Sequence, residues 1–266
     1  MKISVIIPSY KPKDYLWKCL DSFCNQTFPK ADYEIIIVLN GCREPYYSEI
    51  EHYIAYHQPV NWNLIQTDKG GVSNARNIAI CAACGEYVCF IDDDDWVTDN
   101  YLEELYAASA KSTIVVSNVQ DYDETTQSYR EGYIGFAFKQ YSNTANLSVL
   151  CGKHFLSSSC CKIIPKDIIG SRRFVDGVTV GEDALFMATL SDEIRNIRLA
   201  DENVIYYRRI RKDSAQYNNV SMRFKIKNRW LLTRLYTKTY FTDVSHYNVL
   251  LFLDRMLAIW KWLFVK

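Results

Sequence analysis

The sequence lacks a long uncharged apolar run near either end. The N-terminal apolar stretch, residues 3–7, is too short for a signal peptide, and no small-residue cleavage site follows it. Near the other end, Asp254, Arg255 and Lys261 interrupt the apolar residues, which disfavours a membrane-spanning helix. We therefore expect a cytoplasmic protein without an export signal or a spanning segment.

The chain also lacks a net charge, because 31 basic residues balance 31 acidic ones. The charges are nevertheless unevenly distributed. Residues 86–104 contain eight acidic side chains and no basic one, whereas residues 208–238 contain ten Lys or Arg and one acid, Asp213. This asymmetry predicts an anionic partner for the basic segment.

Disulfide bonds are not expected, although the chain has nine cysteines. Without a secretion signal, cysteines are normally free thiols of a reducing compartment. Cys81 and Cys84 have the spacing of a metal or redox motif, but they fall in a predicted helix, and the adjacent pair Cys160–Cys161 is a poor second half for a zinc site. We interpret the cysteines as small buried hydrophobic residues.

The feature that organises the chain is a run of four carboxylates, Asp92–Asp95, directly after the apolar residues 87–91. Two like charges about 4 Å apart cost roughly 4 kcal/mol at an effective dielectric near 20, so a half-buried run needs a counter-ion. Oxygen ligands suit Mg²⁺ or Mn²⁺, which keep other positions for phosphate and water. A solvated acidic loop is the alternative. The position after a strand favours the metal site, because ligands of open α/β sheets bind at the carboxyl ends of strands.

The first 118 residues alternate apolar runs with helical periodicity, which predicts βαβ units and a parallel sheet. Strands are predicted at residues 3–7, 34–39, 63–66, 87–91 and 114–117. Because parallel strands end at the same edge, the turns at Pro8–Tyr10 and Asn40–Cys42 should face one crevice. Gly70 and Gly71 precede a helix that carries Arg76. The start of this helix is either a phosphate-binding site or an ordinary turn. Gly85 is predicted to end this helix as a C-cap.

The remainder of the chain is less regular. Residues 121–161 are rich in Tyr, Ser, Gly and Phe and predict loops with an antiparallel ribbon. Glu182 and Asp183 begin an apolar helix, where acidic residues are common because they complement the helix dipole. Residues 204–212 predict a strand that runs into a basic loop. Residues 249–264 predict an amphipathic helix that lies at a membrane interface or packs on protein.

Seven blocks, in order, resemble the family 2 inverting glycosyltransferases, which have the GT-A nucleotide-sugar fold. The blocks are Ser4–Tyr10, Cys19–Phe23 with Gln26–Phe28, Glu34–Val38, Gly71–Asn77, Gly85–Tyr87, Phe90–Trp96 and Gly181–Asp183. The resemblance implies an α/β fold with a Rossmann-like, mostly parallel sheet flanked by helices and a C-terminal helical extension. It implies a GT-A domain at 1–215, with a nucleotide-binding half at 1–118 and an acceptor-side half at 119–215, and a basic amphipathic extension at 216–266.

The resemblance also implies roles for individual residues. Asp92 and Asp94 match the metal motif, with Asp94 as the direct ligand, and Asp183 matches the catalytic base, with Glu182 beside it as the alternative. Two positions depart from the family pattern. Asn40 replaces the usual Asp that contacts the uracil ring of the nucleotide, and Lys69 replaces a frequent Asn. The residues expected to bind the donor are Pro8, Ser9, Tyr10, Asn40, Lys69, Arg76, Asp92, Asp93, Arg209 and Arg211.

The implied function is a metal-dependent inverting glycosyltransferase of the hexosyl type, with Mn²⁺ or Mg²⁺ as cofactor. It would move a sugar from a nucleoside-diphosphate sugar, expected to be a UDP-sugar, to a saccharide or lipid-linked acceptor in surface polysaccharide synthesis. An anionic membrane on the inner face of the cell and a second copy of the chain are candidate partners, and nucleic acid is not.

Two other functions stay open. A nucleotidyltransferase acting on sugar phosphates would favour a Gly-rich loop with a lysine near the N-terminus, and Pro8–Tyr10 contains no glycine. A non-catalytic module that binds carbohydrate or a partner is disfavoured by the presence of both Asp94 and Asp183.

Overall fold

The computed structural model describes residues 1–57, 60–211 and 221–261. The strands are β1 (Ile3–Ser9), β2 (Tyr33–Asn40), β3 (Asn61–Thr67), β4 (Tyr87–Phe90), β5 (Trp96–Val97), β6 (Thr113–Val116), β7 (Asn118–Asp123), β8 (Ser128–Glu131), β9 (Lys162–Pro165), β10 (Asn196–Leu199) and β11 (Ile205–Ile210). The α-helices are α1 (Tyr15–Cys24), α2 (Tyr46–Tyr56), α3 (Val72–Ala82), α4 (Tyr101–Ala107), α5 (Tyr133–Tyr141), α6 (Lys166–Ile169), α7 (Glu182–Leu190), α8 (Met222–Thr242) and α9 (Val249–Lys261), with 3-10 turns η1 (Lys30–Asp32) and η2 (Lys153–Leu156).

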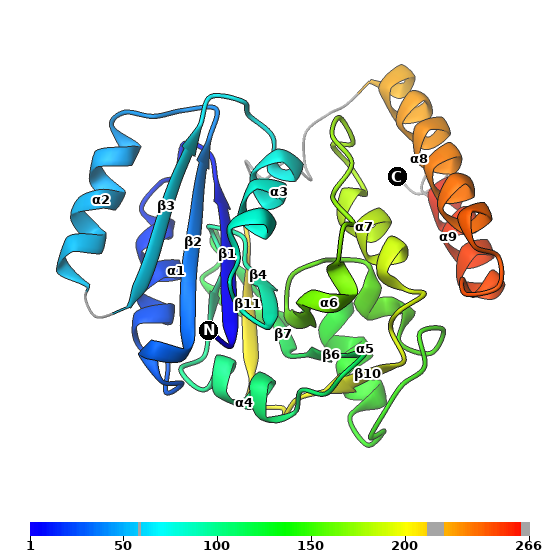
Figure 1. Cartoon of the computed structure of the whole chain (residues 1–266), viewed down its shortest axis with the longest axis horizontal. Helices are drawn as coiled ribbons and strands as arrows, with labels where there is room; N and C mark the ends of the chain where they lie inside the picture. Colours follow the sequence, from blue (N-terminus) through cyan, green and yellow to red (C-terminus); the bar gives the residue numbers. More distant parts are fainter. Residues whose placement is uncertain (58–59, 212–220, 262–266) are drawn as a thin grey trace.

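The central sheet has the strand order β10-β6-β9-β4-β1-β2-β3 within the described residues. All neighbours in it run parallel except β9, which is antiparallel to both β4 and β6. In Figure 1, α3 lies to the right of β1–β3 and α2 lies to their left, so helices lie on both sides of the sheet. This is the mostly parallel α/β architecture that the sequence predicts.

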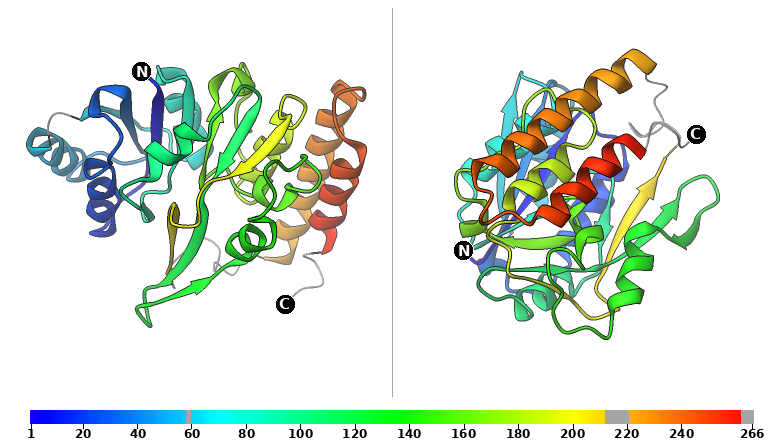
Figure 2. Two further views of the ribbon diagram at one scale, coloured as in Figure 1. Left: turned by 90° about the horizontal axis from the view of Figure 1, so that it is seen from below. Right: turned by 90° about the vertical axis from the view of Figure 1, so that its right-hand side faces the viewer.

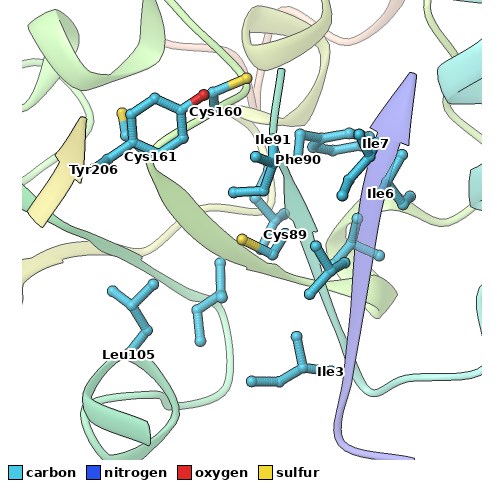
Figure 3. Close-up of a cluster of buried hydrophobic side chains, with 14 of the residues drawn as sticks. Ile3, Ile6, Ile7, Cys89, Phe90, Ile91, Leu105, Cys160, Cys161 and Tyr206 are labelled. Carbon is cyan, nitrogen blue, oxygen red and sulfur yellow. The ribbon is translucent and has the colours of Figure 1, made fainter. Parts of the chain in front are cut away.

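The buried strands explain why this part of the fold is regular. Every residue of β1 and β2 is buried, as expected for parallel strands covered on both faces. Figure 3 shows Ile6 and Ile7 of β1 beside Phe90 and Ile91, where β4 ends. Their β-branched and aromatic side chains fill the main core, which also includes Leu251 of α9. The core therefore runs from the first strand to the last described helix.

The second sheet has the order β5-β11-β7-β8. Strands β7 and β8 form the antiparallel ribbon predicted for the middle region, but β7 also pairs in parallel with β11. The helix α5 was not predicted. Its signal is the spacing of Ile134, Ala137 and Phe138, whose side chains are buried, within a segment rich in Tyr, Gly and Phe.

The predicted C-cap role of Gly85 is wrong. The helix α3 already ends at Ala82, and its C-cap is Ala83, whose backbone is extended. A Cβ atom on Gly85 would lie 2.5 Å from the backbone nitrogen of Ser4, so glycine is required there because the chain passes against β1.

The C-terminal helices α8 and α9 lie side by side at the opposite end of the molecule from α2 (Figures 1 and 2). The helix α8 packs on α7 through a second apolar cluster of Val178, Leu185, Ala188, Leu232 and Tyr236, and Phe252, Met256 and Ile259 of α9 pack against this cluster. One face of the extension is therefore packed on protein. No helix within the described part of the chain is long and apolar enough to cross a bilayer. Lys212, Leu263 and Phe264, which belong to the predicted basic loop and terminal helix, lie outside the described residues.

Candidate active site

The turns after β1, β2 and β3 meet at one edge of the sheet, as predicted. The side chain of Asn40 joins them: its amide nitrogen donates to the carbonyl of Ser9 at 2.7 Å, and its amide oxygen accepts from the Gly71 N–H at 2.9 Å. Asn40 thus fixes the end of β1 against the start of α3. Pro8 lies within β1, and Tyr10 just beyond it is 54% exposed.

Two of the four consecutive aspartates pair with arginines. Arg76 donates to Asp92 at 2.9 Å, and Arg211 contacts Asp94 at 2.6 Å. Arg76 lies in α3 and Arg211 just after β11, so the two carboxylates are held from different parts of the fold.

The other two aspartates accept hydrogen bonds from hydroxyl groups. Ser9 donates to Asp93 at 2.6 Å, and Tyr206 donates to the buried Asp95 at 2.5 Å. The backbone N–H of Arg209 also donates to Asp95, at 2.7 Å. Asp95 therefore anchors β11 against the end of β4, whereas Asp93 faces the turn after β1.

Arg76 connects the aspartate run to the start of α7. Its guanidinium is 2% exposed and donates to Asp183 at 2.6 Å as well as to Asp92, and it lies 4.0 Å from Glu182. Burial lowers the pKa of Arg76, but the surrounding carboxylates outweigh this effect and raise it. The arginine is therefore a permanent cation shared by two acidic groups that are distant in sequence.

Asp183 has further partners from the loop before β9. Ser159 donates through its backbone N–H at 3.3 Å and its hydroxyl at 3.1 Å, and Ser158 donates its hydroxyl at 3.4 Å. Lys162 is fully buried and holds this loop, donating to the carbonyls of Ser158 at 2.7 Å and Cys160 at 2.5 Å. Sequence reasoning missed these three residues. The only signal was the polar run at 157–159 between apolar segments.

The predicted cations near β11 are also in contact with acids. The Arg209 guanidinium donates to the carbonyl of Asp94 at 2.9 Å and to Glu124 at 3.2 Å, and it lies 5.1 Å from the Trp96 ring centroid. Lys69 lies away from this group and pairs with Asp176. Beside the arginines is a cavity of about 430 Å³ lined by Lys13, Asp14, Tyr15, Lys18, Glu124, Arg209 and Arg211.

Within the part of the chain that the structure describes, more carboxylates than arginines lie at this site. The six carboxylates of Asp92–Asp95, Glu182 and Asp183 lie near three arginines, 76, 209 and 211. Burial, together with the neighbouring carboxylates, raises the pKa of Asp94, Asp95 and Glu182 and raises that of Asp93 to about 7. Bringing a cation to the site would relieve this repulsion.

The residues fit a hard divalent cation. Among the described residues, no three His, Cys, Asp or Glu side chains are grouped as ligands. Mg²⁺ and Mn²⁺ need only one or two carboxylates when phosphate and water supply the other oxygens. Asp94, with its side chain partly accessible and its pKa raised, meets that requirement.

The fold agrees with the comparison with known proteins. The model of the family described as Glycosyl transferase family 2 matches residues 4–171, and the chain belongs to this family. Glycosyltransferase GlyA of Streptococcus pneumoniae is 33% identical over 156 residues, which cover 54% of this chain and 21% of GlyA.

A second relative is known both in sequence and in structure. The poly(ribitol-phosphate) beta-N-acetylglucosaminyltransferase TarS of Staphylococcus aureus is 32% identical over 109 residues, 40% of this chain and 18% of TarS. The crystal structure of TarS 1-349 in complex with UDP-GlcNAc superposes with a TM-score of 0.69 at 20% identity and covers 89% of this chain and 66% of that one.

The mannosyltransferase PcManGT of Pyrobaculum calidifontis, in complex with GDP-Man and Mn²⁺, gives a TM-score of 0.63 at 15% identity, covering 91% of this chain and 64% of that one. The described chain thus has the GT-A fold. It spans about a fifth of the length of the curated relatives GlyA and TarS.

The raised pKa of Asp93 predicts a pH-dependent stability. In the presence of a chelator, the wild-type protein should lose stability as the pH rises from about 5 to about 8, because the folded state resists ionisation of Asp93. Asp93→Asn carries no such proton and keeps an oxygen for Ser9, so its stability relative to the wild type should increase over the same range. Chemical denaturation at several pH values measures this difference.

Asp123→Asn is the control. Backbone N–H groups of Thr126 and Thr125 lower the pKa of Asp123, so this carboxyl stays ionised across the range and the variant should differ from the wild type by a constant amount. A difference for Asp93→Asn that stays constant or shrinks as the pH rises would contradict the assignment.

Proposed function

We propose that the protein is a metal-dependent inverting glycosyltransferase that transfers a sugar from a nucleoside-diphosphate sugar. The observation that carries the proposal is the buried Arg76, which holds Asp92 at the end of β4 and Asp183 at the start of α7 within reach of one guanidinium. A site for a metal-bound diphosphate and a site for a general base would then lie side by side. Inverting transfer requires this arrangement, since the base acts next to the carbon from which the diphosphate departs.

In the proposed reaction, Asp183 accepts the proton of the acceptor hydroxyl as that oxygen attacks the anomeric carbon. Arg76, Ser158 and Ser159 hold the carboxylate in position. Asp94, assisted by Asp92, would hold Mn²⁺ or Mg²⁺, which when bound supplies positive charge next to the departing diphosphate. Arg211 pairs with Asp94 in the structure. When the donor binds, Arg211 would pair with a phosphate of the diphosphate instead.

The donor is proposed to be a UDP-sugar. The similarity to TarS, whose structure contains UDP-GlcNAc, supports uridine, whereas PcManGT contains GDP-Man. The exposed ring of Tyr10 is available to stack on a base. The proposed donor-binding residues remain Pro8, Ser9, Tyr10, Asn40, Lys69, Arg76, Asp92, Asp93, Arg209 and Arg211.

The acceptor is proposed to be a saccharide or lipid-linked saccharide of a cell-surface polymer. Support comes from TarS, whose name gives poly(ribitol-phosphate) as its acceptor. Residues 1–215 would form the catalytic part, with the nucleotide bound by 1–118 and the acceptor bound by 119–215. Residues 216–266 would form the extension. A sugar-phosphate nucleotidyltransferase finds no support in the family match, and a non-catalytic module would release no UDP from a panel of UDP-sugars.

We predict that Asp94→Ala abolishes transfer and removes the metal-dependent part of UDP affinity, because the cation would bridge this carboxylate and the diphosphate. Calorimetric titration with UDP, with and without Mn²⁺, measures the effect. Asp99→Ala is the control, since this nearby carboxylate is exposed and outside the site. Equal UDP affinity with and without Mn²⁺ in the wild-type protein would rule out the metal role.

We also predict that Asp183→Asn lowers turnover by roughly 10²-fold or more while UDP affinity changes little, since an amide keeps the shape but cannot accept the proton. Release of UDP from UDP-sugars gives the turnover. Glu182→Gln is the matched control at the adjacent position and should be milder. A collapse of UDP affinity in Asp183→Asn would assign Asp183 to the nucleotide site and make Glu182 the candidate base.

The extension is proposed to dock on an anionic membrane that presents the acceptor. Leu250, Leu253 and Leu257 form one exposed stripe of α9, and Leu257 is 73% exposed. The exposed cations of the adjacent α8 are Arg223, Lys225, Lys227, Arg234 and Lys238, and α8 contains no acidic residue. Each such cation contributes about 1 kcal/mol near an anionic surface, and the apolar stripe can insert at the acyl boundary.

We predict salt-sensitive binding to phosphatidylglycerol-containing vesicles that Leu253→Ser with Leu257→Ser weakens by roughly tenfold or more, because apolar area is lost from the inserted surface. Co-sedimentation measures binding. Point changes are preferred to deletion because Leu251 of the same helix is in the core. The control is Tyr56→Ser, an 86% exposed residue of α2 at the other end of the molecule. Loss of a dimer without loss of vesicle binding would assign the stripe to a second copy of the chain.

A further inference from the structure

The turn that begins α7 determines where the proposed base lies. Gly181 is the N-cap of this helix and has φ +86°, a left-handed conformation that favours glycine. Its carbonyl accepts the first helical hydrogen bond, from the Leu185 N–H at 3.0 Å. Glu182 and Asp183 are the first two residues after it. A shift of this turn would therefore move the Asp183 carboxylate directly.

The C-terminal helix α8 holds this turn from outside the site. Asn228 donates its side-chain N–H to the carbonyl of Val180 at 3.0 Å. One helical turn later, Leu232 packs so closely on Gly181 that a Cβ atom there would lie 3.1 Å from a Leu232 methyl carbon. These two side chains lie on one face of α8, which runs beside α7 in Figure 1.

The helix α8 is itself fixed by independent contacts. Arg229 donates to the carbonyl of Ile259 in α9 at 3.0 Å. The helix α9 is in turn tied to η2, where Lys153 pairs with Asp254 and the Lys153 carbonyl accepts from Arg255 at 2.5 Å. The turn before Asp183 is therefore clamped between the catalytic core and an anchored helical hairpin.

We propose that Asn228 and Leu232 are positioning residues for the general base and that the C-terminal extension is part of the catalytic apparatus. The inference rests on the proposed role of Asp183. Both residues act through the Val180–Gly181 backbone and touch no reacting atom. A displacement of about 1 Å in a catalytic group can lower a rate by 10²-fold, so small changes in this packing should be visible in turnover.

The test compares Leu232→Ala and Asn228→Ala with Leu251→Ala, which removes an equally buried leucine from α9 at a place that does not contact the turn. We expect kcat to fall roughly tenfold or more in Leu232→Ala, with the Kd for UDP in Mn²⁺ and the KM for the UDP-sugar within about twofold of wild type. Leu232→Met should restore kcat because it keeps the volume. Amide hydrogen exchange should rise at residues 178–186 in Leu232→Ala but not in Leu251→Ala.

The outcomes separate this inference from the proposed function. If Leu232→Ala and Leu251→Ala lower kcat equally, or if UDP affinity falls as far as kcat, the positioning role is overturned even though Asp183→Asn remains inactive. If Asp183→Asn stays active, the proposed role of Asp183 as the general base is overturned, whatever the result for Leu232→Ala. Should Leu232→Ala not fold, Asn228→Ala carries the test, because its partly exposed side chain contributes a single hydrogen bond and no core volume.

Discussion

The arrangement of the site depends on one buried cation. Arg76 is almost wholly removed from solvent, and its two terminal guanidinium nitrogens donate to Asp92 on one side and to Asp183 on the other, whereas its Nε has no hydrogen-bond partner among the described residues. A desolvated charge of this kind is tolerated only when paired, and removal of one partner of such a pair typically costs about 3–5 kcal/mol. The three elements that carry these residues, α3, the end of β4 and the start of α7, are therefore held in register by electrostatics as well as by the core beneath them.

Each of the four consecutive aspartates has its own partner, so the four carboxylates do not act as one shared group. Asp92 and Asp94 face arginines, whereas Asp93 and Asp95 accept from hydroxyl groups. The chain turns directly after β4, with the Asp95 N–H donating to the Asp92 carbonyl at 3.1 Å, and this turn directs the four side chains to different surroundings. Asp94 is partly accessible and pairs with Arg211, whereas Asp92 is more exposed, at 44% of its side chain, and pairs with the buried Arg76. Among the described residues of the site the carboxylates outnumber the arginines, so a divalent cation bound there together with the diphosphate would reduce the electrostatic repulsion.

The sequence predicts residues 1–118 well because the strands there are covered on both faces. Runs such as Ile35–Leu39 can only be buried strands, and parallel strands bring the turns at Ser9 and Asn40 to one edge. It predicts the middle region less well, since α5 and the antiparallel pairing of β9 depend on packing rather than on a local pattern. The same holds for Lys162 and the two serines that contact Asp183. A buried lysine that donates to two carbonyls produces no periodic pattern in the sequence. The proximity of Asp183 to the aspartate run came from family resemblance, and its physical cause, the bridging Arg76, is visible only in three dimensions.

The C-terminal extension contacts the turn that carries Asp183 although it lies outside the site. Its inner face packs on α7, and Asn228 and Leu232 meet the turn before Asp183. Its outer face carries the exposed leucine stripe of α9 and the cations of α8. The two faces of the extension therefore carry separate contacts: the inner face meets the turn before Asp183, and the described residues of the outer face make no contact with that turn.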